Sequence, residues 1–114
     1  MTFAIARVYD PPGEDDGARV LVDRLWPRGL AKDGARIDLW LKDVAPSTQL
    51  RREFHHDPER FAEFTRRYRD ELAGNPAVER LRELERERGR VTLLYGAKDT
   101  EHNQAVVLRD FLAS

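Results

Sequence analysis

Short apolar segments of strand length occur near both ends of the chain. Residues 3 to 9 alternate apolar with small or charged side chains, and residues 19 to 25 are rich in β-forming types. Residues 37 to 41 carry apolar side chains at every second position, which favours a third strand or an extended segment. Residues 91 to 95 form a continuous apolar run, the pattern of a strand buried on both faces.

Helical periodicity begins after the third of these segments. Ser47 is expected to cap a short helix over residues 48 to 55, and Asp57 to cap a longer helix that begins at a proline. The longer helix should turn one stripe of side chains inward, formed by Phe61, Phe64, Tyr68 and Leu72. A third helix is predicted between residues 76 and 89, and a last one over residues 100 to 112.

This order of elements predicts an α/β fold. We expect a small, single-domain open sheet of about three to four strands with packed helices, spanning residues 1–114. The loop at residues 10 to 17 is too short for a crossover helix. The first two strands should therefore pair as a hairpin with a long loop, or the loop should wrap around an edge of the sheet.

Composition and charge exclude several classes of function. Lys and Arg number 20 and Asp and Glu 21, so the net charge of −1 offers no long-range attraction to nucleic acid or an anionic membrane. The absence of cysteine excludes thiol nucleophiles, cysteine-bound zinc and disulfides. No apolar run approaches the roughly 18 residues of a membrane span, and no secretory signal is visible, so we expect a cytoplasmic protein. The sequence does not predict an oligomeric state.

Two polar segments follow predicted strands. Residues 23 to 29, with the sequence DRLWPRG, come after one strand, and residues 95 to 103 come after the last. If both strands run parallel, the two segments share the sheet edge where ligands of open α/β folds bind. Arg24, Arg28 and Lys98 would then surround one pocket for a phosphate or carboxylate, with the N-terminus of the last helix adding partial positive charge. Trp26 and Tyr95 could stack on a planar group.

Each of these residues also has a structural interpretation. The arginines can pair with some of the 21 carboxylates, and Asp99 or Thr100 can serve as an ordinary helix cap. Both interpretations remain open at the level of sequence.

Histidines supply the only side chains with a pKa near neutrality. In an enzyme, His102 or His56 would carry the proton and Asp99 would orient or assist it. The adjacent pair at residues 55 and 56 does not predict a metal site, because consecutive residues point in different directions. No Walker motif, dinucleotide-binding glycine motif or nucleophile elbow is present, and the sequence identifies no cofactor.

Several motifs in one order give the chain a resemblance to a known family. They are DRLWPRG at residues 23–29, WLKDVAPS at 40–47, Leu50-Arg51, His56-Asp57, Phe64, Tyr68 to Leu72, TLLY at 92–95, Lys98-Asp99 and Asn103. On these motifs the chain resembles the YeaO-like family, which is grouped as family 488 of the domains of unknown function. The match covers nearly the whole chain and implies a small α/β domain with no established activity.

The resemblance also sharpens the set of candidate site residues. Its polar motif positions in this chain are Arg24, Trp26, Arg28, Lys42, Ser47, His56, Tyr95, Lys98, Asp99 and Asn103. Four cations among them have no assigned partner, and converging cations without a ligand would repel one another. The first hypothesis is therefore a pocket for a small anionic ligand. The alternatives are a nucleic-acid-binding or regulatory module, a hydrolase or transferase of phosphate substrates, and a structural or partner-binding domain.

Overall fold

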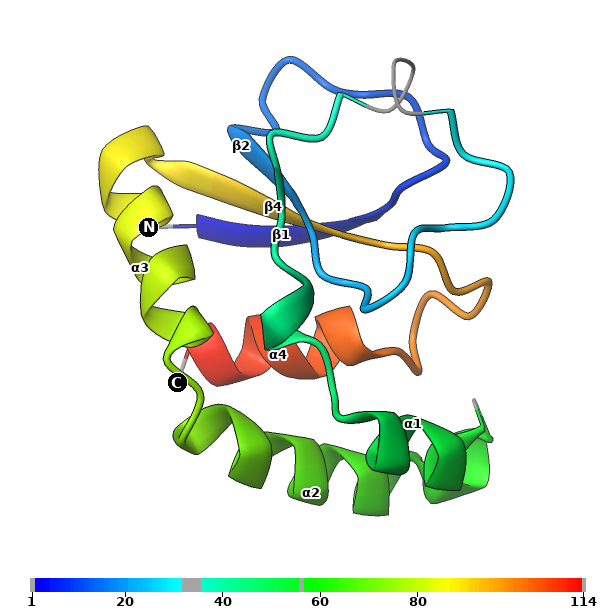
Figure 1. Cartoon of the computed structure of the whole chain (residues 1–114). Coiled ribbons are helices and arrows are strands. Elements are labelled where there is room, and N and C mark those ends of the chain that lie inside the picture. The colour runs from blue at the N-terminus through cyan, green and yellow to red at the C-terminus, as the bar shows by residue number, and fades with distance from the viewer. Residues whose placement is uncertain (1, 32–35, 56, 114) are drawn as a thin grey trace.

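Four parallel strands form the centre of the molecule, in the order β1-β4-β2-β3 (Figure 1). The computed structural model describes residues 2–31, 36–55 and 57–113. The strands are β1 (Thr2–Arg7), β2 (Ala18–Leu21), β3 (Leu39–Trp40) and β4 (Arg90–Tyr95). The α/β class and the strand number are as the sequence predicts.

The pairing of the first two strands differs from the prediction. β1 and β2 neither form a hairpin nor lie side by side, because β4 is inserted between them and pairs with both. The local pattern around residues 10 to 17 suggested pairing of sequence neighbours, but β4 is buried along almost its whole length and takes the central position. Parallel strands need no tight turn between them, so the loop simply crosses over β4.

Local signals place most helix ends correctly. The helices are α1 (Thr48–Phe54), α2 (Phe61–Ala73), α3 (Ala77–Arg88) and α4 (Gln104–Ala113), with 3₁₀ turns η1 (Lys42–Val44) and η2 (Pro58–Arg60). Ser47 accepts a hydrogen bond from Leu50 N as the N-cap of α1, and Gly89 ends α3 in the left-handed conformation. Asp57 caps η2, which leads directly into α2.

The last helix begins four residues later than expected. Residues 100 to 103 form bends rather than helix, and α4 begins at Gln104. Asn103 is fully buried and accepts a hydrogen bond from Val106 N, so it occupies the capping position. The threonine and the acidic residues that precede Asn103 favour an earlier helix start at the level of sequence. In the structure, the buried side-chain amide of Asn103 caps the helix instead.

The two faces of the sheet are covered differently. Helices pack on one face, where Val20, Val91 and Leu93 join the main apolar cluster. Leu21 and Leu94 point to the opposite face and pack with Val8 and with loop residues. Figure 1 shows the helices on one side of the strands and the long loops on the other. β4 is therefore buried on both faces, as its sequence predicts, with loops instead of helices on the second face.

The first loop is anchored to the sheet by polar contacts. Thr92 Oγ1 donates to the carbonyl of Asp16 at 2.7 Å. The guanidinium of Arg19, which is 1% exposed, pairs with the Asp16 carboxylate and donates through Nε to the carbonyl of Arg36 at 3.0 Å. These contacts hold the loops toward the amino ends of β2 and β4, and the parallel pairing places the carboxyl ends of the strands at the opposite edge.

Candidate functional site

A cleft of about 640 Å³ lies at the carboxyl edge of the sheet. It is formed by the segment after β2, the start of α1, the segment after β4 and the first residue of α4. Its lining residues are Tyr9, Asp23, Arg24, Leu25, Trp26, Pro27, Arg28, Ala45, Pro46, Thr48, Arg51, Arg52, Phe54, His55, Phe64, Gly96, Ala97 and Gln104. The volume lies in the range of small-molecule sites. The expectation that the segments after β2 and β4 share one edge is confirmed.

The segment after β2 is held as a preset turn. Arg24 donates to the carbonyls of Ala45 and Pro46 at 3.1 and 3.3 Å, so its guanidinium joins this segment to the start of α1. Trp26 Nε1 donates to the carbonyl of Leu30 at 2.9 Å and closes the turn. Gly29 has a φ of 76°, a left-handed conformation that glycine adopts without strain.

Asp23 is the one carboxylate among the residues that line the cleft. It accepts a hydrogen bond from Gly96 N at 2.9 Å through Oδ2, and another from the Gln104 side chain through Oδ1. Burial raises the pKa of Asp23 to about 6, opposed by these two hydrogen bonds and by the charge of Arg51. The carboxylate is thus held by neutral donors from two other segments.

Arginine dominates the charge of the cleft, with Arg24, Arg28, Arg51 and Arg52 among its lining residues. Within the described ranges, the guanidiniums of the exposed Arg28 and Arg52 meet no acceptor. Arg51 Nε is buried and makes no hydrogen bond to any described residue. Four arginines against one carboxylate leave an excess of positive charge around a partly apolar cavity.

Aromatic and aliphatic side chains form the apolar walls. Phe54 and Phe64 stack at 4.3 Å between ring centroids and line the inner part of the cleft. Trp26 meets Trp40 edge to face at 5.4 Å, and the neighbouring Leu25 is 66% exposed. Apolar walls with a few charged groups are typical of sites for small ligands with a hydrophobic or planar part.

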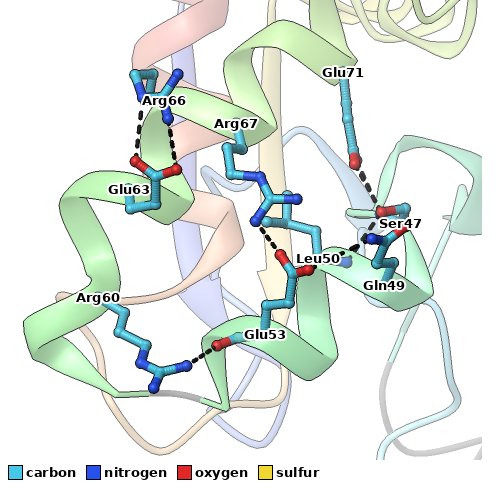
Figure 2. Close-up of polar contacts among 9 residues, drawn as sticks. All are labelled: Ser47, Gln49, Leu50, Glu53, Arg60, Glu63, Arg66, Arg67 and Glu71. Carbon is cyan, nitrogen blue, oxygen red and sulfur yellow. Dashed lines mark hydrogen bonds and ion pairs between the residues drawn. The ribbon is translucent and has the colours of Figure 1, made fainter.

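Three predicted ligand-binding residues have internal roles and do not line the cleft. Tyr95 is 3% exposed within the main core, where burial raises the pKa of its hydroxyl. Asn103 caps α4. Ser47 caps α1 and also donates to Glu71 Oε2 at 2.7 Å, which links α1 to α2 (Figure 2).

The two predicted lysines also lie outside the cleft lining. Lys42 is exposed and its ammonium stands over the ring of Trp40 at 5.2 Å. Lys98 is exposed in the segment after β4. Of the predicted ligand-binding residues, the structure brings Arg24, Trp26 and Arg28 together.

The predicted proton-transfer residues form a separate pair. His102 Nδ1 lies 3.0 Å from Asp99 Oδ2, and the His102 ring packs edge-on against Phe61 at 5.2 Å. Asp99 accepts the backbone N–H groups of Glu101 and His102, and these bonds, with the His102 side chain, lower its pKa. Neither residue lines the cleft. His56 lies outside the described residues.

Two further classes of site find no support within the described ranges. No three histidine, aspartate or glutamate side chains there are grouped so that they could hold a metal ion. No helix in the same ranges has the length and apolarity needed to cross a membrane.

Sequence reasoning did not assign Asp23, Arg51 and Gln104 to the ligand site. Asp23 comes two residues after the end of β2, and its position beyond a strand end was a usable signal. Arg51 follows Leu50, an inward position of α1, which places it beside the core. Gln104 gave no signal, because its role depends on where α4 begins.

The chain is similar to proteins described only as uncharacterized. A family model described as the inactive DUF488-N3 subclade (DUF488-N3i) matches residues 2–114. An uncharacterized protein of Mycobacterium tuberculosis is 47% identical over 108 residues, covering 95% of this chain and 91% of that protein. The uncharacterized protein YeaO of Escherichia coli is 44% identical over 115 residues, covering 100% of this chain and 99% of that protein. No solved structure matches the chain.

Proposed function

The chain belongs to the YeaO-like family, in the branch described as the inactive DUF488-N3 subclade, and we propose that it binds a small anionic ligand in the cleft at the carboxyl edge of its sheet. The ligand carries a phosphate or carboxylate group. One observation carries the proposal: four arginines and one carboxylate line a cleft of about 640 Å³ at the sheet edge where α/β folds bind ligands.

The state of the arginines supports an anionic ligand. The buried Arg51 Nε has no acceptor among the described residues, and such an unsatisfied donor costs about 1–3 kcal/mol. Arg28 and Arg52 add two exposed guanidiniums at the same cleft. A bound phosphate or carboxylate would accept charge-assisted hydrogen bonds from the exposed guanidiniums and would reduce the repulsion among the arginines of the cleft.

Binding is favoured over catalysis by two observations. The family description calls the matching subclade inactive. The His102–Asp99 pair, the only candidate for proton transfer that we predicted and that the structure describes, is not part of the cleft lining. A hydrolase or transferase of phosphate substrates would need a proton carrier within reach of the bound phosphate.

A small ligand is also favoured over nucleic acid. In a nucleic-acid-binding module, adjacent arginines outside the cleft such as Arg66 and Arg67 would contact phosphates, but both residues are engaged by carboxylates. Arg66 Nη2 contacts Glu63 Oε1 at 2.5 Å and Arg67 pairs with Glu53, as Figure 2 shows. Paired arginines on the helix surface leave little positive charge for a backbone of phosphates. Steeply salt-dependent DNA binding in a gel-shift assay would favour the nucleic-acid module instead.

A thermal-shift screen tests the proposal directly. The purified protein is screened against nucleotides, sugar phosphates, aromatic carboxylates and inorganic phosphate, and hits are measured by calorimetry. A ligand that binds the folded state alone raises the apparent melting temperature. We expect at least one anion with an apolar or planar part to stabilise the protein more than inorganic phosphate does.

Two arginine variants, one in the cleft and one outside it, test whether the ligand binds in the cleft. Arg52→Gln should weaken the best hit by about ten-fold, because one charge-assisted bond contributes roughly 1.5–3 kcal/mol. The control is Arg88→Gln, since Arg88 is an exposed arginine at the end of α3 and does not line the cleft. The proposal fails if no anion stabilises the protein, or if both variants weaken binding equally.

A further inference from the structure

A carboxylate within a cluster of arginines is unexpected in a site that binds only anions. Asp23 lies at the end of β2 and lines the cleft together with Arg24 and Arg51. Asp23 holds the cleft together through its bonds to Gly96 and Gln104, but an ionised carboxylate repels a bound phosphate or carboxylate, so its charge weakens the binding of a simple anion. The presence of Asp23 therefore points to a second feature of the ligand.

The hydrogen bonds of Asp23 leave part of its accepting capacity unused. An ionised carboxylate has about four lone-pair sites. The described contacts use one on each oxygen, from Gly96 N to Oδ2 and from Gln104 Nε2 to Oδ1. Both donors are neutral, and they come from the segment after β4 and from the start of α4. Asp23 can still accept a hydrogen bond from a group in the cleft.

Arg51 does not satisfy this remaining capacity. Its charge lowers the pKa of Asp23, so the two groups are near each other, yet no hydrogen bond joins them in the described structure. Arg51 Nε is itself buried without an acceptor. Asp23, which has accepting capacity left, and Arg51, whose guanidinium makes no hydrogen bond to any described residue, thus both line one cleft. Two such groups match a ligand that offers a donor and an acceptor close together.

We propose that Asp23 and Arg51 recognise a ligand in which an N–H donor lies close to an anionic or carbonyl oxygen acceptor, so that the cleft selects N–H-bearing anions over anions without such a donor. This inference rests on the proposed function and names the chemistry of its ligand. Two kinds of small molecule have an N–H donor beside an oxygen acceptor. They are α-amino acids, with an ammonium beside a carboxylate, and nucleotides whose base presents ring or exocyclic N–H groups beside a carbonyl. In both kinds of molecule, an N–H group donates a hydrogen bond to Asp23.

Matched pairs of probes separate the two sources. The first pair is phenylalanine and 3-phenylpropionate, which differ by the ammonium group. The second is guanosine 5′-monophosphate and purine riboside 5′-monophosphate, whose base has no N–H. Affinities are measured by calorimetry or ligand-observed NMR at millimolar concentrations. We expect the N–H-bearing member of one pair to bind about ten-fold more tightly than its partner, the scale of a charge-assisted hydrogen bond.

The variant Asp23→Asn identifies the residue responsible. It keeps the size of the side chain and one acceptor oxygen but removes the charge. We expect it to abolish the preference within the pair, both by weakening the N–H-bearing probe and by strengthening the probe without N–H. The control Asp43→Asn changes an exposed aspartate of η1 that does not line the cleft, and it should leave the preference unchanged.

A measurement on the unmodified protein covers the case in which Asp23→Asn does not fold. The charge of Arg51 from α1 acts on Asp23, and Asp23 in turn acts on Tyr68 of α2, as the adjacent Arg24 does. Burial raises the pKa of the Tyr68 hydroxyl, so that group stays neutral over the acid range. The preference for the N–H-bearing probe should therefore shrink between about pH 7.5 and about pH 5 as Asp23 takes up a proton. The pH series uses the nucleotide pair, because its two members share the phosphate and the titration of that group cancels in the comparison.

The outcomes distinguish the two proposals. Equal binding within both pairs, or a preference that survives in folded Asp23→Asn or at low pH, overturns the role of Asp23 while anion binding stands. The role of Asp23 is also overturned, and anion binding still stands, if none of the four probes binds but other anions stabilise the protein. If no anion of any kind binds, the proposed function fails and this inference fails with it.

Discussion

Asp23 Oδ2 accepts a hydrogen bond from Gly96 N at 2.9 Å, and this contact joins the ends of β2 and β4 across 73 residues of sequence. The approach is so close that a Cβ atom at position 96 would stand 2.9 Å from the same oxygen and 3.5 Å from Pro27 Cβ. Gly96 thus allows the backbone of one strand end to reach the carboxylate of the other. The floor of the cleft depends on this contact.

The first prediction concerns Gly96→Ala. The added methyl group must displace the Asp23 carboxylate, which Gln104 also holds, so the variant should lose about 1–2 kcal/mol of unfolding free energy. It should also weaken ligands of the cleft, because Asp23 and Pro27 both line it. Gly74→Ala is the control, since a Cβ added there would meet nothing within 4 Å. Urea denaturation compares the two, and equal losses would contradict the prediction.

Much of the fold is encoded locally and could be predicted. The caps at Ser47, Asp57 and Gly89 act between residues a few positions apart, so their sequence signals suffice. The continuous apolar run of β4 predicts burial on both faces, which the structure confirms. These features depend on side-chain type and spacing alone.

Other features depend on contacts that no local pattern reveals. The insertion of β4 between β1 and β2 joins segments about 70 to 90 residues apart, and the loop between the first strands gives no sign of it. The late start of α4 follows from the burial of Asn103, a tertiary effect. The composition of the cleft was only half predicted for the same reason: Arg24 and Arg28 stand in a motif, whereas Arg51 and Gln104 reach the cleft through the packing of α1 and α4.

A second prediction concerns the pH dependence of stability. Burial raises the pKa of Asp23 from 3.8 to about 6, so the folded state binds this proton more tightly than the unfolded state does. The stability that this proton contributes is fully present below the pKa of Asp23 in the unfolded state. It is lost as the pH rises through the pKa of Asp23 in the folded state. Relative to Asp23→Asn, the wild-type protein should gain about 2 kcal/mol between about pH 7.5 and about pH 4.5. Urea denaturation at both values measures this difference.

The comparison with Asp23→Asn isolates one group. Asp16 and Asp99 have lowered pKa values in the folded state, so their contributions run the opposite way and decline in acid. Both residues are present in wild type and variant, and their effects cancel in the difference. A difference that is flat with pH would show that folding leaves the pKa of Asp23 unchanged, and one that grows in favour of the variant in acid would show that folding lowers it.

The third prediction separates capping from ligand binding at Ser47. Ser47→Ala removes the hydrogen bonds of the hydroxyl with Leu50 N and Glu71 and should cost about 1 kcal/mol of unfolding free energy. Ser47→Thr keeps a capping hydroxyl and should recover most of it. Because Ser47 does not line the cleft, ligand affinity should be unchanged in both variants. Calorimetry on the folded Ser47→Ala protein that found weakened binding would return Ser47 to the ligand site.

The last prediction contrasts two glycines that share a left-handed backbone. Gly17 has a φ of 66° and Gly89 a φ of 79°. A Cβ at Gly17 would stand 2.1 Å from the backbone carbonyl oxygen of Arg90, where the first loop crosses the start of β4, whereas nothing lies within 4 Å at Gly89. Gly89→Ala should therefore cost about 1 kcal/mol, the strain of the left-handed conformation alone. Gly17→Ala adds a clash between two backbone segments and should cost more than about 3 kcal/mol. Denaturation of both variants measures the contrast, and similar losses would mean that the loop can move away from β4 at little cost.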